Sequence, residues 1–160
     1  MPDMLVKLYE LPELDRELAD IRQTGVIIRS AMTPEKARVM DWVNSRFVSW
    51  GAEVEAAFSH RPVSCFLAVE KERILGFACH DVTCRNFFGP MAVEQSARRR
   101  GLGKALLLAA LHAQKAQGYA YSIIGGVGPV DFYRKSVGAV PIKGSSPGVY
   151  GGLLLPAKKD

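Results

Sequence analysis

Helix-like and strand-like patterns alternate along this chain. Leu14, Leu18 and Ile21 recur at helical spacing, and so do the apolar residues between Leu102 and Ala113. Short β-branched or continuous apolar runs, bounded by glycine, proline or polar residues, are typical of strands. The predicted helices cover residues 13–23, 34–50, 52–58, 101–117 and 130–137. The predicted strands cover residues 6–8, 26–29, 65–69, 74–82, 87–93, 119–125, 139–142 and 149–155.

The order of these elements predicts how the strands pair. The runs at 65–69, 74–82 and 87–93 follow one another through short polar segments, as in an antiparallel meander. The helix at 101–117 separates two strands, and a strand–helix–strand unit implies a parallel crossover. We therefore predict an α/β fold with a mixed, mostly antiparallel sheet flanked by helices.

Local signals set the limits of the second helix. Thr33 is a suitable N-cap, and Pro34 is a suitable first helical residue. Gly51 is expected to break this helix, and a shorter helix continues from Ala52. The apolar stripe that ends at Trp50 is expected to pack in the core or to form one wall of a substrate cleft.

The composition is that of one ordinary globular domain. The chain has 160 residues, of which 48% are apolar and 23% are charged. No apolar run reaches transmembrane length, and the first residues lack the pattern of a secretory signal. We therefore expect a cytoplasmic protein without a membrane partner.

Cysteine and histidine show no pattern of a disulfide framework or a metal site. The three cysteines are an odd number without a CxxC pair, and the three histidines are scattered. Cys65 and Cys79 lie in apolar runs and are expected in the core. We expect no bound metal.

A short basic segment is the strongest chemical signal. The net charge of +5 suits a partner that carries phosphate, and the densest basic stretch is residues 98–104. This stretch joins a predicted strand to a predicted helix, whose first turn offers unpaired N–H groups and the positive end of the dipole. Gly101 and Gly103 have no Cβ, so a phosphate can approach the backbone closely.

Two common phosphate motifs fit this segment less well. A P-loop requires serine or threonine after its lysine, whereas Ala105 follows Lys104. A dinucleotide fingerprint requires a third small residue, whereas Leu106 stands at that position.

The segment resembles motif A of the GCN5-related N-acetyltransferases (GNAT). Their pattern [RQ]-x-x-G-x-[GA] matches Arg-Arg-Arg-Gly-Leu-Gly at residues 98–103, with a strand before it and a long helix after it. Residues 131–139, which include Tyr133, are similar to the late helix of the family. The resemblance covers residues 26–155 and implies one acyltransferase domain over residues 1–160, with residues 1–25 as an added strand and helix.

The resemblance implies a site for acetyl-CoA. Backbone amides of the basic turn would bind the pyrophosphate, and the preceding strand would pair with the pantetheine arm and polarise the thioester carbonyl. The residues implied are Met91, Ala92, Val93, Arg98, Arg99, Arg100, Gly101, Leu102, Gly103 and Lys104. Tyr133 matches the tyrosine that members often use as a general acid toward the departing thiolate.

The general base is harder to identify from the sequence. Members often use a glutamate on the strand before motif A, but residues 86–93 contain no acid. The candidates are Asp81 and His80 on the neighbouring strand, Glu94 at the strand's end, and Asp131; we take Asp81 as the working choice. A backbone carbonyl or bulk water could also suffice for an amine of modest pKa.

The implied reaction is direct transfer of an acetyl group from acetyl-CoA to a primary amine of a small molecule in a ternary complex. The helical region 33–60 carries aromatic and acidic residues that suit a small cationic or sugar-like amine. Trp50, Glu53 and Tyr150 are the candidate contacts. The segments around Tyr133 and Tyr150 look similar to bacterial acetyltransferases associated with amino sugars.

Other functions compete with this one. A non-catalytic acyl-CoA sensor or partner module would keep the basic turn but would not need Tyr133. A nucleic-acid-binding module would use the net charge of +5, but the basic run has no aromatic residue within it, so we expect no nucleic-acid partner. We also consider a homodimer that pairs through the late strands.

Overall fold

The computed structural model describes residues 1–154, and its strands form one seven-stranded sheet. In spatial order the strands are β2 (Ile27–Ser30), β3 (Cys65–Glu70), β4 (Arg73–His80), β5 (Phe87–Val93), β6 (Tyr121–Ile124), β1 (Met4–Lys7) and β7 (Val140–Pro141). The pair β5–β6 is parallel, and the other five pairs are antiparallel. The predicted mixed, mostly antiparallel sheet is confirmed.

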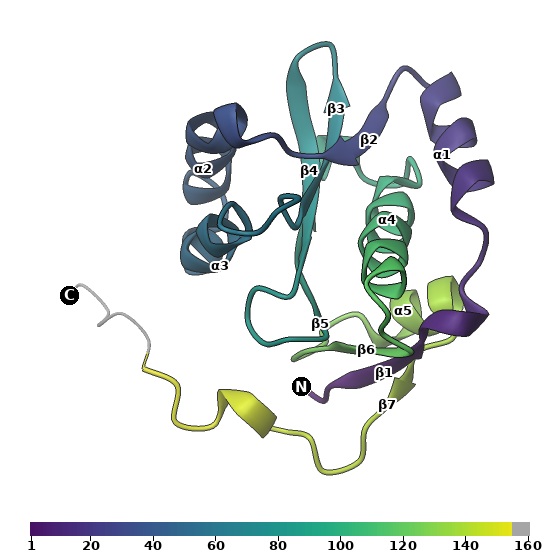
Figure 1. The fold of residues 1–160 in the computed structure, drawn as a ribbon, viewed down its shortest axis with the longest axis vertical. Coiled ribbons are helices and arrows are strands. Elements are labelled where there is room, and N and C mark those ends of the chain that lie inside the picture. The colour runs from purple at the N-terminus through teal and green to yellow at the C-terminus, as the bar shows by residue number, and fades with distance from the viewer. Residues whose placement is uncertain (155–160) are drawn as a thin grey trace.

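Helices cover both faces of this sheet (Figure 1). On one face α2 (Lys36–Asn44) and α3 (Gly51–Ala57) lie together, whereas α4 (Leu102–Ala116) crosses the other face with α1 (Leu14–Gln23) beside it. α5 (Val130–Val137) follows β6. Side chains alternate along β4, so this strand contributes to the core on both faces of the sheet. Phe77 and Cys79 face α2 and α3, whereas Ala78 belongs to the core under α4.

The position of β1 is set by the tertiary structure. The strand lies between β6 and β7 and pairs antiparallel with both. Met4 and Val6 are fully buried in the same core as α4. The first strand of the chain is therefore an interior strand of the sheet.

The predicted limits of the second helix are wrong. Met32, rather than Thr33, precedes a short 3-10 turn (Thr33–Glu35), and α2 ends at Asn44. Gly51 begins α3 instead of ending the preceding helix.

Aromatic residues pack together where this helix breaks. The Phe47 and Trp50 rings stack with centroids 5.3 Å apart, and both lie against Phe77, at 6.4 and 6.3 Å. Residues three apart share one face of a helix, so this packing alone would also suit a continuous helix; the break lies in the backbone, where Phe47 has φ −140° and ψ 59°.

The predicted last strand is also wrong within the described residues. Gly148–Tyr150 form a 3-10 turn, residues 151–154 form no strand, and residue 155 lies outside the described range. Gly148 and Gly152 have positive φ angles, +59° and +76°, which are incompatible with a strand. No helix in residues 1–154 is long and apolar enough to cross a membrane.

Candidate active site

The site begins where β5 and β6 part. The two strands pair only through Phe87 and Phe88 in the described chain. Phe88 lies opposite His80 and Met91 opposite Ala78, so β5 accommodates one extra residue between these pairs. This bulge contains Pro90, which has no N–H to donate to a ladder. Beyond it β5 and β6 diverge, and a cleft of about 1200 Å³ opens between them.

Past the bulge, one edge of β5 presents free peptide groups to the cleft. The Glu94 N–H donates to the Leu75 carbonyl at 2.8 Å, so residue 94 turns toward β4. By alternation the peptide groups of Met91 and Val93 face the other way. The Val93 carbonyl already accepts a hydrogen bond from Arg98 Nε at 3.3 Å. This edge can therefore pair with an extended ligand.

The basic turn closes one end of the cleft. Arg99 and Gly101 have left-handed backbones, with φ of +64° and +79°, and α4 begins at Leu102. The Ala105 N–H donates to the Gly101 carbonyl at 3.1 Å, the first bond of the helix. The N–H groups of residues 102–104 precede that bond and are available to an anion.

Gly103 lies at a narrow part of the cleft. A Cβ at this position would lie 3.6 Å from Phe132 and 3.9 Å from Val93, which is ordinary contact distance. A methyl group fits there, but any longer side chain would project between the two walls.

The basic side chains do not all serve the cleft. Arg98, Arg99 and Lys104 line it, and Lys104 is held by Glu17 of α1 at 2.8 Å. Nine of the ten residues implied for the donor site line this cleft; Arg100 is the exception.

The side chain of Arg100 points to β3 instead. Its guanidinium lies 2.6 Å from the Glu70 carboxylate, and this hydrogen bond lowers the pKa of Glu70. The interpretation of three arginines as one anion-binding group is therefore too broad, because one of them has a carboxylate partner.

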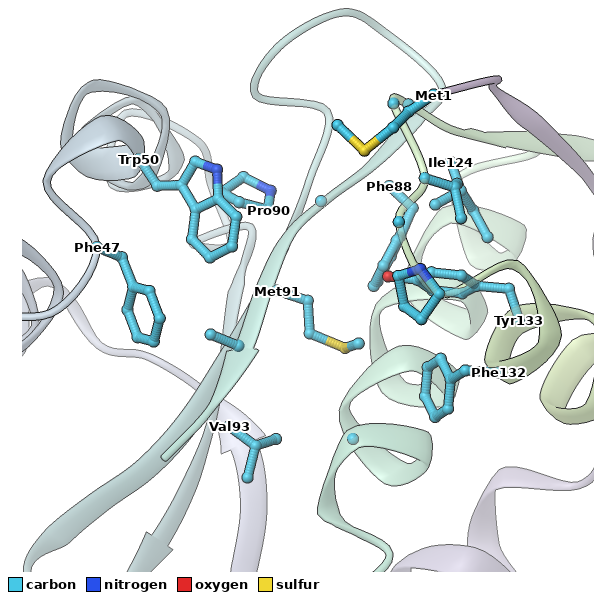
Figure 2. Close-up of a pocket in the computed structure, with 18 of the residues that line it drawn as sticks. Met1, Phe47, Trp50, Phe88, Pro90, Met91, Val93, Ile124, Phe132 and Tyr133 are labelled. Atoms are coloured by element: carbon cyan, nitrogen blue, oxygen red, sulfur yellow. The ribbon is translucent and has the colours of Figure 1, made fainter. Parts of the chain in front are cut away.

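Tyr133 lies on the wall formed by α5. Its ring centroid is 5.0 Å from that of Phe132 and 6.3 Å from that of Phe88, and the residue is 8% exposed. Figure 2 shows its hydroxyl facing the cleft, across from Met91. Burial raises the pKa of Tyr133 to about 12, so the hydroxyl keeps its proton at neutral pH.

The opposite wall is aromatic and carries one acid. Phe47 and Trp50 face the cleft from the far side of Met91 (Figure 2). Glu53 of α3 lines the same wall, and the Thr83 hydroxyl donates a hydrogen bond to Glu53 Oε1.

Tyr150 and the glycine loop after β6 form the third wall. A Cβ on Gly125 would lie 2.1 Å from Tyr150 Oη, so only glycine leaves room for this tyrosine. Burial raises the pKa of Tyr150 to about 12. The wall is tied to β1, because the Asp3 N–H donates to Ser145 Oγ at 2.7 Å and Asp3 Oδ1 accepts from the Gly126 N–H at 2.8 Å.

The four sequence candidates for a base all lie outside the cleft lining. Asp81 sits in the turn after β4, 2.7 Å from His80 Nδ1, and accepts from the Asn86 N–H at 2.6 Å. Burial acts to raise the pKa of Asp81, but these hydrogen bonds outweigh it and leave the pKa below its ordinary value. Glu94 contacts two arginines at 3.6 and 3.7 Å, and Asp131 pairs with Arg134 on the surface.

Several lining residues were missed from the sequence, among them Thr83 and Gly125. Thr83 and Gly125 carry no motif that marks them. Gly125 was visible as part of a glycine loop, but its role depends on Tyr150, which is distant in the sequence. Thr83 gave no signal at all.

Comparisons with known proteins agree with this geometry. Residues 61–136 match the model of the Acetyltransferase (GNAT) domain, which includes β3 to α5 and the basic turn. No curated protein matches the chain.

Solved structures share the fold. The glucosamine N-acetyltransferase region of a fungal multi-domain GH3 beta-N-acetylglucosaminidase superposes with a TM-score of 0.72 at 14% identity, over 88% of this chain and 19% of that one. A GCN5-related N-acetyltransferase from Sphaerobacter thermophilus gives 0.62 at 17% identity, over 88% and 48%. An aminoglycoside acetyltransferase from an uncultured soil metagenomic sample gives 0.53 at 14%, over 71% and 88%. The chain thus spans about a fifth of the length of the fungal protein and about half of the length of the Sphaerobacter thermophilus protein.

Proposed function

The chain carries an acetyltransferase domain of the GNAT family, and on this premise we propose that it transfers an acetyl group from acetyl-CoA to a primary amine of a small molecule. One observation carries the proposal. The free edge of β5 leads directly to the N-terminus of α4, and the hydroxyl of Tyr133 faces the same cleft.

The donor side fits an extended thioester that ends in a pyrophosphate. The peptide groups of Met91 and Val93 would pair with the pantetheine arm, and the N–H groups of residues 102–104 would bind the pyrophosphate. Arg98 and Arg99 line the same end and add positive charge without carboxylate partners among residues 1–154.

The reaction forms a C–N bond and breaks a C–S bond. The neutral amine attacks the thioester carbonyl, and the thiolate departs toward Tyr133. With a pKa of about 12 against about 8.5 for a thiol, full proton transfer from Tyr133 would be uphill by about 5 kcal/mol. We therefore assign Tyr133 as a hydrogen-bond donor that stabilises the thiolate, which takes up a proton as it reaches solvent.

The acceptor side suits an amine carried on a ring. The stacked pair Phe47 and Trp50 offers an apolar wall, and Glu53 offers a negative charge beside it. Two of the structures with this fold are described as acting on glucosamine or aminoglycosides, which supports an amino sugar as the acceptor. Direct attack is supported because both sides open into one cleft.

Calorimetry with acetyl-CoA and a thiol-release assay test the proposal. The assay uses a panel of glucosamine, an aminoglycoside and benzylamine. We expect binding at the micromolar level, turnover with at least one amine, and a roughly 10- to 100-fold lower kcat in Tyr133→Phe with acetyl-CoA affinity unchanged. Binding without turnover would favour an acyl-CoA-binding module, and no binding by the folded protein would refute the donor site.

A further inference from the structure

The proposed acceptor poses a proton problem. A primary amine resembling that of lysine has a pKa near 10 and is mostly an ammonium ion at neutral pH. An ammonium nitrogen has no lone pair with which to attack a carbonyl. The cleft must therefore contain a group that takes a proton from the bound acceptor.

The side chains lining the cleft leave one suitable group. Among residues 1–154, Glu53 is the only carboxylate in the lining. The other charged side chains there, Arg98, Arg99 and Lys104, are cations. Tyr133 and Tyr150 both have pKa values raised to about 12 by burial, so neither is an anion that could accept a proton at neutral pH.

Glu53 is also held in a defined position. The Thr83 hydroxyl, from the loop between β4 and β5, donates to Oε1 and leaves Oε2 free to meet a ligand. The titratable groups that interact electrostatically with Glu53 are the buried Cys79 thiol and Tyr150, and Tyr150 also interacts with Asp3 and Cys84. Burial raises the pKa of the Cys79 thiol well above its ordinary value and that of Tyr150 to about 12, so both of these groups are neutral at neutral pH.

We infer that Glu53 binds the acceptor as an ammonium ion and takes its proton before attack, with Thr83 as the positioning residue. The inference rests on the proposed function. Because a carboxylate is a weaker base than the amine, Glu53 serves as a relay, and one proton of the ammonium passes through it to solvent. The nitrogen attacks, loses its second proton as the amide forms, and the departing thiolate gains one proton. Each turnover therefore releases one net proton.

A matched pair of variants tests this role. Glu53→Gln removes the charge and keeps the shape. Glu55→Gln is the control, because Glu55 lies on the same helix, pairs with Lys36 at 2.9 Å and does not line the cleft. The readouts are kcat and KM between pH 6 and 10, for whichever panel amine turns over fastest, together with the acetyl-CoA Kd.

We expect Glu53→Gln to lower kcat about 100-fold at pH 7 and to leave the acetyl-CoA Kd within about twofold. The loss should shrink about tenfold per pH unit toward the pKa of the amine, because the fraction of neutral amine grows by that factor. Thr83→Val should show a smaller loss with the same pH trend. Glu55→Gln should behave as the wild type.

Three results would overturn the inference. Glu53→Gln could match Glu55→Gln, its loss could be equal at every pH, or Asp81→Asn could show the pH-dependent loss in its place. These outcomes leave the proposed function intact, provided that the wild type binds acetyl-CoA and acetylates an amine. A wild type that acetylates no amine in the panel would refute the proposed function and this inference together.

Discussion

The two sides of the cleft are built in different ways. The proposed donor side comes largely from one continuous stretch, residues 88–104, which offers a ligand the peptide groups of β5 and of the first turn of α4. The proposed acceptor side draws on three distant segments, represented by Glu53, Thr83 and Tyr150. Its contacts are side chains.

This difference separates what a motif can encode from what a fold assembles. Peptide groups are common to every residue, so the donor side needs only glycines, a bulge and a helix start in the right order. The acceptor side depends on which side chains meet across the cleft, and it can change without altering the donor side. The variants below affect one side and leave the other as an internal control.

The largest effect is expected at Gly103 on the donor side. Gly103→Glu places a negatively charged side chain next to Val93 and Phe132, where we expect the pyrophosphate to bind. We expect the acetyl-CoA Kd to rise at least about 100-fold, or about 2.7 kcal/mol. Gly103→Ala is the control, because its Cβ would meet Phe132 at 3.6 Å, and it should bind within about tenfold of the wild type. If calorimetry finds the same acetyl-CoA affinity in Gly103→Glu and in the wild type, the proposed donor site is contradicted.

The acceptor side should respond to Gly125→Ala. The added Cβ would lie 2.1 Å from Tyr150 Oη, so Tyr150 must move. We expect the acceptor KM to rise about tenfold, or about 1.4 kcal/mol, with the acetyl-CoA Kd unchanged. Adding Tyr150→Phe removes the clashing hydroxyl and should recover part of the loss, which steady-state kinetics on the double-mutant cycle would reveal. Strictly additive losses would mean that the two residues act separately.

Arg98 and Arg100 should differ although they are close in sequence. Arg98→Ala should weaken acetyl-CoA binding about fivefold, and the effect should diminish at high salt. Arg100→Ala should change the Kd less than about twofold, because its side chain pairs with Glu70 away from the cleft. Titrations at two salt concentrations check both. Equal losses would show that Arg100 leaves Glu70 when acetyl-CoA binds.

The last prediction concerns the stability of the fold at alkaline pH rather than binding. The pKa of Tyr133 is raised from 10.0 to about 12, so the unfolded chain loses this proton at lower pH than the folded chain. The free energy of unfolding should therefore fall as the pH rises from 10 to 12, by up to about 3 kcal/mol from this residue. Below about pH 10 this residue should cause no change of stability with pH. Tyr133→Phe should flatten the fall in urea unfolding curves at pH 9 and pH 11. An unchanged slope would assign the fall to other groups.

The sequence predicted most of the fold but not its limits. The meander, the crossover through α4 and the mixed sheet are confirmed, because they follow from the apolar pattern and the order of elements. The break after Asn44 and the missing last strand were not predicted. The first occurs where Phe47 leaves the helical backbone region, which the helical spacing of the apolar residues does not signal. The second depends on the positive φ angle of Gly152, which the residue type permits but does not specify.

Some residues of the candidate site were found from the sequence, and others only from the structure. Trp50, Glu53 and Tyr150 line one cleft in the folded chain, and their role in binding an acceptor stays a prediction. Asp81 as a base stays a prediction, although its carboxylate lies outside the cleft and has partners of its own. Thr83 was missed because its one informative contact, with Glu53, joins segments 30 residues apart.

By itself, the sequence determined the basic, glycine-containing turn before α4, since helix starts and glycines act through local backbone that needs no distant partner. The tertiary structure decided where β1 lies, which arginine is neutralised and which carboxylate reaches the cleft. Those outcomes depend on side chains and strands that meet only after folding. Residues of the same type then differ in their burial and in their partners.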